Sequence, residues 1–441
     1  MKNAMKKLKS YVKKYVIPAK IWTLMHKSRC NIRYYKDNIL PLHIVYNQRE
    51  HLIKKRTNPI NVLFFAVIDN NWKYDSLFKL MMENPNFNPL IIVCPCPVHD
   101  KEFLDETMKQ CCQYFDAKKY PYICSYDPTT KSYIDARGYK PDIIFYTTPY
   151  PGGTIENYTM NNFKDVLSCY VDYFYVTFTE PWTCASDFHK MVWRYYLEYS
   201  LLEKQINQLY WPCKVNTRVV GYPHFDAFRQ YRISDNDWPI SGTRKKRIIW
   251  SPHHTISSNS ELIAMSTFEK YYDFMWRMAE KYSKEIQIVF KPHPALKPRL
   301  YKDDNWGKER TDAYYERWAN GINTAYVNGE YVGLFLASDA MIHDCNSFTV
   351  EYLAVNKPVM FLDSGKMDEK LNEVGVEARN CHYKGYSQED IERFIQDVIL
   401  SGDDELKERR EAFFKNYILP SNGKLAAENI IDDLLLSLGR K

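Results

Sequence analysis

Short apolar runs alternate with longer helical or polar segments from residue 60 onward. The first half of the chain contains four β-rich runs: NVLFFAVI (61–68), PLIIVCP (89–95), YICSY (122–126) and DIIFYTT (142–148). The run SCYVDYFYVTF (168–178) is a further strand candidate, and the Trp- and Tyr-rich stretch 184–210 is predicted to be helical. Strands that alternate with helices are typical of a parallel sheet with helices on its faces. This half is therefore predicted to be an α/β domain.

A second alternating series begins near residue 218. Its strand candidates are RVVGYP (218–223), RIIWSPHH (247–254), EIQIVFKPHP (285–294), TAYVNG (324–329), DAMIHD (339–344) and KPVMFLD (357–363). Helical stretches at 259–282 and 388–400 cover this series, and the region 232–245 is predicted to be a loop. The fold class is therefore α/β, with two facing Rossmann-like domains that would hold a ligand at the carboxyl ends of their strands.

The same pattern divides the chain into four parts. They are a basic amphipathic N-terminal arm (1–56), an N-terminal Rossmann-like domain (57–215), a C-terminal Rossmann-like domain (216–422) and a C-terminal amphipathic helix (423–441). With 441 residues, of which 45% are hydrophobic, the two domains can each bury a sizeable core.

The N-terminal arm holds the whole basic excess of the chain. Residues 1–56 contain 15 Lys or Arg and two acids, whereas the remainder has 45 basic and 52 acidic residues. Apolar residues recur at helical spacing among the lysines of the arm: Met5, Leu8, Val12, Tyr15 and Val16. A basic amphipathic helix is typical of a peripheral anchor on an anionic membrane surface. An ordinary docking helix with a solvated lysine face is the alternative, and no nucleic-acid partner is expected because nothing else basic is clustered.

The cysteines and the hydropathy indicate the compartment. There are 11 cysteines, an odd number at irregular spacing, and we find no signal peptide. This pattern predicts a reducing, cytoplasmic setting. Cys94-Pro95-Cys96 with His99 fits no common zinc spacing, so buried thiols are the preferred interpretation. No apolar run reaches the roughly 18 residues needed to span a bilayer, so the protein is expected on the inner face of the cell membrane without crossing it.

Two strand-end segments carry the candidate chemistry. Lys291-Pro292-His293-Pro294 follows the run EIQIVF, and the segment 344–352 follows SDAMIH. Asn346 and Ser347 are good N-cap residues for a helix that would begin there, and Glu351 lies one turn further on. A helix N-terminus with free N–H groups binds anions. Together with His293 and Lys291, this segment predicts a pyrophosphate site.

Four segments of the second half resemble the CDP-glycerol glycerophosphotransferase family, bacterial enzymes that prime or polymerise teichoic acids and related phosphodiester capsules. They are Gly221-Tyr222-Pro223-His224-Phe225-Asp226, Trp250-Ser251-Pro252-His253-His254-Thr255, Lys291-Pro292-His293-Pro294 and the segment from Asp344 to Tyr352. The likeness covers about residues 216–365. It implies the GT-B arrangement, in which the second domain binds an activated nucleotide donor and the first presents the acceptor.

The resemblance also implies roles for individual residues. His293, Ser347 and Glu351 take the family's nucleotide-contact positions. From chemistry, His293 and Lys291 would stabilise charge on the departing nucleotide phosphate. Asn346 and Ser347 would hold phosphate oxygens, and Glu351 would accept hydrogen bonds from ribose hydroxyls.

The remaining assignments concern the histidine pair at the end of the strand candidate 247–254, the general base and the need for a metal. His253 is the preferred catalytic residue of the pair at 253–254, and His254 is a second candidate for the donor phosphate. The family's tryptophan–histidine–glycine segment, whose histidine is thought to be the base, is missing from the first half. Asp69, which follows the first strand, is therefore the candidate base. No metal is required, although Mg²⁺ is a possible aid, and the pair in Asp235-Asn236-Asp237 is interpreted as a turn.

These residues predict a transferase that moves a polyol-phosphate (glycerophosphate-like) group from a CDP-linked donor to a hydroxyl of a lipid-linked or glycan acceptor. The product would be a phosphodiester of a cell-surface polymer. Two alternatives stay open: a GT-B glycosyltransferase that uses a nucleotide-sugar donor, and an inactive relative that acts as a membrane assembly subunit. Fold alone does not separate them.

Overall fold

The computed structural model describes residues 30–97, 101–127, 129–210, 216–256, 265–365 and 370–440. They form two compact units. Unit 1 combines Met1–Tyr173, Pro181–Val220 and Ala427–Lys441, and unit 2 combines Phe174–Glu180 with Gly221–Ala426. The basic helix predicted for the start of the arm lies outside the described residues, as does His99. The described part of the arm forms a helix, α3 (Leu40–Lys54), after a π-helical turn, η1 (Tyr35–Ile39).

Unit 1 is built on a seven-stranded parallel sheet with the strand order β3-β2-β1-β6-β7-β8-β9. The strands are β1 (Ile60–Ala66), β2 (Phe87–Val93), β3 (Tyr122–Cys124), β6 (Ile143–Tyr146), β7 (Leu167–Val171), β8 (Arg194–Leu197) and β9 (Thr217–Val219). Every residue of β6, β7 and β8 is buried. Strands covered on both faces are expected to be mostly apolar, and these three contain only two non-aromatic polar residues, Ser168 and Arg194.

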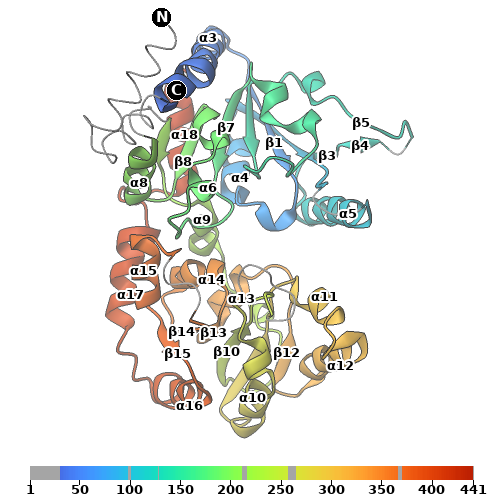
Figure 1. The fold of residues 1–441 in the computed structure, drawn as a ribbon, viewed down its shortest axis with the longest axis vertical. Coiled ribbons are helices and arrows are strands. Elements are labelled where there is room, and N and C mark those ends of the chain that lie inside the picture. Colours follow the sequence, from blue (N-terminus) through green and yellow to red (C-terminus); the bar gives the residue numbers. More distant parts are fainter. Residues whose placement is uncertain are drawn as a thin grey trace, which may run out of the picture. The chain divides into compact units, whose positions relative to one another are not determined.

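The helices of unit 1 connect and cover these strands (Figure 1). They are α4 (Asp75–Glu83), α5 (Lys101–Lys118), α6 (Pro181–Cys184), α7 (Asp187–Met191), α8 (Ser200–Tyr210) and α18 (Ala426–Ser437). A short hairpin, β4 (Tyr126–Asp127) and β5 (Ser132–Tyr133), lies outside the main sheet. Helix α18 returns to this unit from the far end of the chain: Asp433 accepts hydrogen bonds from Arg194 Nε (3.1 Å) and from the Tyr196 hydroxyl (2.9 Å) of β8.

Unit 2 is built on a six-stranded parallel sheet with the order β12-β11-β10-β13-β14-β15. The strands are β10 (Lys246–Ser251), β11 (Ile286–Phe290), β12 (Thr324–Tyr326), β13 (Ala340–His343), β14 (Val359–Leu362) and β15 (Tyr383–Gly385). Numbered within the unit, this order is 3-2-1-4-5-6, the order of a doubly wound Rossmann sheet. The first six strands of unit 1 follow the same order. The predicted fold class is confirmed.

Helices surround the sheet of unit 2 (Figure 1). They are α9 (Pro223–Gln230), α10 (Phe268–Lys281), α11 (Leu296–Tyr301), α12 (Gly307–Asn320), α13 (Val332–Ala337), α14 (Asn346–Glu351), α15 (Glu373–Asn380), α16 (Gln388–Arg393) and α17 (Lys407–Phe413), with π-helical continuations at Phe394–Ser401 and Phe414–Ile418. One face of the sheet is packed by aromatic rings: Trp250 lies 5.0 Å from Phe290 and 5.5 Å from Trp318, measured between ring centroids. This core holds the carboxyl ends of β10 and β11 at fixed positions.

Three predicted elements were wrong in detail. The stretch 184–210, predicted to be helical, contains the strand β8 between α7 and α8. Its run of aromatic residues suits a fully buried strand as well as a helix. The run at 218–223 does not begin the second series, because β9 pairs with β8 at the edge of the first sheet. The strand candidate 168–178 ends at Val171, and residues 174–180 pack in unit 2, where Thr177 O accepts a hydrogen bond from Asn372 N (2.8 Å).

Candidate functional site

The candidate site lies where the direction of strand order reverses in unit 2. Strand β10 pairs with β11 on one side and with β13 on the other, and Ser251 is in register with His343. All three strands are parallel, so the segments that follow them leave the sheet at one edge. At such a switch point an open α/β sheet binds its ligands.

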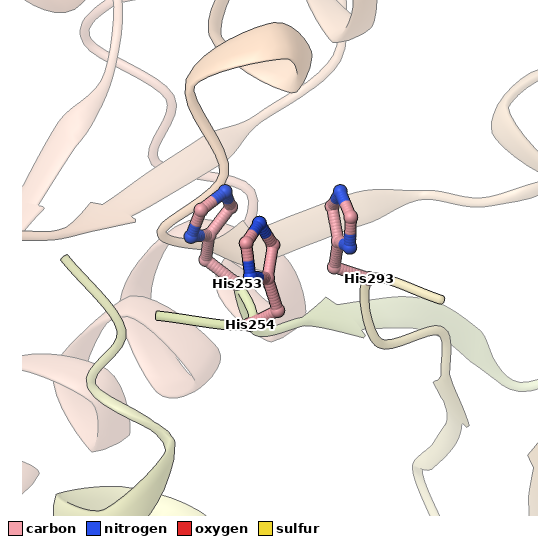
Figure 2. Close-up of side chains that lie close together, drawn as sticks. All are labelled: His253, His254 and His293. Atoms are coloured by element: carbon pink, nitrogen blue, oxygen red, sulfur yellow. The ribbon is translucent and has the colours of Figure 1, made fainter. Parts of the chain in front are cut away.

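Three histidines meet at this edge. His253 and His254 follow β10, and His293 follows β11 (Figure 2). The ring centroids of His254 and His293 are 4.2 Å apart, those of His253 and His254 4.2 Å, and those of His253 and His293 5.2 Å. We call these residues the histidine cluster. The sequence pointed to all three separately, and the structure brings them into contact.

Backbone hydrogen bonds fix the tautomer of two of these imidazole rings. The amide of Ala295 donates to Nδ1 of His293 (3.1 Å), and the amide of Thr255 donates to Nδ1 of His253 (3.3 Å). A nitrogen that accepts an N–H bond carries the lone pair, so the single proton of a neutral ring lies on Nε2. Both rings therefore present an Nε2–H donor.

The cluster is neutral at physiological pH. Burial lowers the pKa of His293 to about 3 and that of His254 to about 4, and both shifts are reinforced by the charge of Arg299. Burial, the two neighbouring rings and Arg299 lower the pKa of His253 to about 2. In this setting His293 is a neutral hydrogen-bond donor. The positive charge comes instead from Lys291 and Arg299.

Lys291 is the first residue after β11 and is only 4% exposed. Burial lowers its pKa to about 8, partly offset by the charge of Glu351. Its Nζ lies 5.4 Å from the ring centroid of Tyr331 and 5.8 Å from that of Phe348. The Lys291 side chain is therefore buried rather than solvated, and its ammonium remains mostly charged at neutral pH.

The helix predicted after the strand at 339–344 is present as α14, but its cap differs from the prediction. The helix begins at Asn346 and its N-cap is Cys345, without a side-chain capping bond. Asn346 donates through Nδ2 to the sulfur of Met265 (3.0 Å), and Ser347 is exposed. Neither side chain caps the helix, and their contact with phosphate remains a prediction.

Glu351 is held by residues that sequence reasoning did not assign to the site. It is 2% exposed and accepts a hydrogen bond from the Tyr331 hydroxyl (2.6 Å). Nε2 of His224 lies 2.8 Å from the same hydroxyl and 4.0 Å from the Glu351 carboxylate. His224 could have been found from the segment Gly221–Asp226, whereas nothing in the sequence singles out Tyr331. The predicted contact of Glu351 with ribose remains a prediction.

Asp344 organises the loop that carries His253. It is fully buried and accepts hydrogen bonds from the amides of His253 and Thr267 and from the Thr267 hydroxyl (2.8 Å). Burial raises its pKa to about 6. The carboxylate therefore ties the carboxyl end of β13 to the loop after β10.

Replacing Asp344 by alanine is expected to lower the free energy of unfolding by about 3 kcal/mol, because buried donors lose their acceptor at roughly 1–3 kcal/mol each. Urea denaturation followed by tryptophan fluorescence measures this loss. Asp304→Ala serves as the control, because Asp304 is exposed. Equal stability of the two variants would contradict the role given to Asp344.

The candidate base, Asp69, belongs to unit 1, whereas the other predicted site residues belong to unit 2. It begins a 3-10 turn (Asp69–Asn71) after β1 and accepts a hydrogen bond from Asn70 N (2.8 Å). Strand β1 pairs with both β2 and β6, so this turn lies at the switch point of the first sheet. Its role as the base remains a prediction.

A buried polar group lies at the end of β7 in unit 1 and was not predicted. Asp172 follows the strand and accepts a hydrogen bond from the Tyr195 hydroxyl (2.5 Å), and Nε2 of His189 is 3.7 Å from its other oxygen. Burial raises the pKa of Asp172. Both Asp172 and His189 have fully buried side chains, so they support the strand ends rather than meet a substrate.

Two Rossmann-like sheets, with neutral N–H donors and a buried cation at a switch point, are features of a transferase of the GT-B fold. The family described as CDP-Glycerol:Poly(glycerophosphate) glycerophosphotransferase matches residues 185–435. The chain belongs to this family and is a transferase. The resemblance seen in the sequence is thereby confirmed.

Solved structures support the fold. The S. aureus protein MnaA with UDP has a TM-score of 0.54 at 13% identity, over 87% of this chain and 97% of that chain. UDP-GlcNAc 2-epimerase from Neisseria meningitidis bound to UDP-GlcNAc has a TM-score of 0.55 at 13% identity, over 85% and 99%. A variant of the wall teichoic acid polymerase TagF has a TM-score of 0.54 at 13% identity, over 94% and 97%. No curated protein sequence matches significantly.

Proposed function

We propose that the protein transfers a polyol-phosphate group, such as glycerophosphate, from a CDP-linked donor to a hydroxyl of a glycan or lipid-linked acceptor during synthesis of a cell-surface polymer. The observation that carries this proposal is the histidine cluster next to the buried Lys291 at the switch point of unit 2. Neutral N–H donors combined with a desolvated ammonium suit a diphosphate, whose charge they stabilise without a proton transfer.

In the proposed reaction the acceptor oxygen attacks the phosphorus of the transferred group. A new P–O bond forms to the acceptor, the bond to the bridging oxygen breaks, and CMP leaves with the electron pair. The Nε2–H groups of His293 and His253, with Lys291, would stabilise the charge that develops on CMP. Asp69 is our candidate for the base that takes the acceptor proton.

Catalysis by this route needs no metal ion at the histidine cluster. One nitrogen from each ring lies within 4.8 Å of the others, so the cluster has the composition of a transition-metal site. Mg²⁺ prefers oxygen ligands, and the two rings whose Nδ1 accepts an amide proton carry a hydrogen, not a lone pair, on Nε2. We therefore propose that Mg²⁺, if it assists, is bound by the donor's phosphates.

The leaving nucleotide tests the proposal. Thermal-shift titrations with CDP-glycerol, UDP-sugars and GDP-sugars identify the donor, and chromatography of the products identifies what leaves. Release of CMP on addition of an acceptor supports phosphotransfer. Release of UDP or GDP supports the alternative, a glycosyltransferase. The UDP-linked donors are included because two structural neighbours were solved with UDP and UDP-GlcNAc.

We also propose that the basic arm holds the enzyme on the inner face of the membrane. No described helix is both long and apolar enough to cross a bilayer. The arm's 15 basic residues against two acids would be attracted to anionic lipid.

Deleting residues 1–29 is expected to abolish sedimentation with vesicles that contain anionic lipid, because the deletion removes nine of the basic residues, Lys2 to Arg29. The midpoint of thermal unfolding should change little, because α3 and the sheet of unit 1 are retained. Neutral phosphatidylcholine vesicles are the control, and undiminished binding of the deleted form to anionic vesicles would contradict the anchor.

A further inference from the structure

An aromatic patch lies at the carboxyl edge of the sheet in unit 1. Tyr150 follows β6 by four residues and Tyr173 follows β7 by two, and these strands are neighbours, with Tyr146 in register with Tyr170. Trp182 in α6 completes the patch. This is the edge at which β1 and β6 form the switch point of the unit, so the patch lies where an α/β sheet presents its ligand-binding groups.

The three rings form a connected surface. The centroid of Tyr150 is 6.1 Å from that of Trp182 and 6.1 Å from that of Tyr173. The hydroxyl oxygens of Tyr150 and Tyr173 are 3.1 Å apart. Trp182 is 58% exposed, the most exposed tryptophan among the described residues, while both tyrosines are half-buried. An exposed indole next to paired hydroxyls combines an apolar face with polar groups that can bond a ligand.

A buried carboxylate, that of Asp172, lies near the patch. Burial raises the pKa of Tyr150 and of Tyr173, and the carboxylate of Asp172 adds to both shifts. The hydroxyls are therefore neutral across the physiological range. A poly(glycerophosphate) chain carries one negative charge per unit and would require Lys or Arg side chains, which bind phosphates. A buried carboxylate beside the patch disfavours such a chain.

We propose that the aromatic patch binds the sugar ring of an uncharged saccharide acceptor. The apolar C–H face of a pyranose would stack on Trp182 and Tyr150, and its hydroxyls would exchange hydrogen bonds with Tyr150 and Tyr173. The inference rests on the proposed transferase function and names its acceptor class. The enzyme then places a polyol phosphate on a saccharide, rather than extending a poly(glycerophosphate) chain.

Kinetics with two acceptor classes test this assignment. CMP release from CDP-glycerol is measured with neutral oligosaccharides and with short glycerol phosphate oligomers, in the wild type, Trp182→Ala and Trp182→Phe. We expect stimulation by a saccharide, an increase of at least tenfold in its KM in Trp182→Ala, and partial recovery in Trp182→Phe. The thermal shift caused by CDP-glycerol alone should be unchanged. Tyr139→Ala is the control, since Tyr139 is an exposed aromatic residue of unit 1 outside the patch.

Stimulation by glycerol phosphate oligomers alone would overturn the proposal, as would an unchanged saccharide KM in Trp182→Ala. A binding measurement without donor separates this inference from the proposed reaction. Saturation-transfer NMR with neutral disaccharides should show contact with the wild type and its loss in Trp182→Ala. If no CDP-linked donor releases CMP, the proposed reaction is wrong, and the NMR result still decides whether the patch binds sugar. Absence of saccharide contact in the wild type would overturn the assignment of the aromatic patch as a saccharide site.

Discussion

Replacing His293 by alanine is expected to lower kcat/KM for the nucleotide donor by roughly 10²–10³-fold, the usual effect of removing one preorganised donor from a developing negative charge. The ring is held by the Ala295 amide and packed against His254, so its Nε2–H has a fixed direction before the donor binds. Initial rates of CMP release over a range of donor concentrations give the change.

Two further variants make this result specific. His293→Gln keeps an N–H donor on a side chain of similar reach and should recover part of the loss. His51→Ala removes an exposed histidine of α3 and should have no effect. Circular dichroism should show that His293→Ala remains folded. Turnover equal to that of the wild type in the folded variant would remove the central residue of the proposed site.

The second large effect concerns pH and Lys291. Its charge is complete well below pH 8, and it is lost as the pH rises through its pKa of about 8. The two phosphates of a CDP-linked donor do not titrate in this range. Donor affinity should therefore be constant from pH 6 to 7 and fall above pH 8, by up to about tenfold per pH unit. Isothermal titration calorimetry between pH 6 and 9.5 measures this dependence.

A second buried lysine, Lys357, serves as a control that separates the pH dependence of donor affinity from a general loss of stability. Lys291→Met should bind the donor weakly at every pH and lose the dependence above pH 8. Burial also lowers the pKa of Lys357 to about 8. Lys357 lies just before β14, and its ammonium donates hydrogen bonds to the carbonyls of Leu336 and Ser338 at the end of α13. Lys357→Met should lower stability and keep the pH dependence. Persistence of the dependence in Lys291→Met would show that another group titrates.

The sequence by itself determined most of the strands and the residues that follow them, although β8 and β15 were not predicted as strands. Runs such as NVLFFAVI and EIQIVF are mostly apolar because both faces of a parallel strand are buried. The carboxyl ends of parallel strands share one edge of the sheet, so Lys291, His293, His253 and His254 could be assigned to one site without coordinates. Family motifs then supplied the class of reaction. These inferences depend on local pattern, which a short window of sequence contains.

Only the tertiary structure decided the strand order and the contacts that follow from it. The order places β10 between β11 and β13, and this brings the rings of the three histidines into contact. It also lets the Asp344 carboxylate accept a hydrogen bond from the amide of His253. It also places β9 in the first sheet, buries Glu351 against Tyr331 and exposes Trp182 beside Tyr150. Each of these contacts joins residues distant in sequence. Burial and neighbouring charge, which set their pKa values, exist only once the chain has folded.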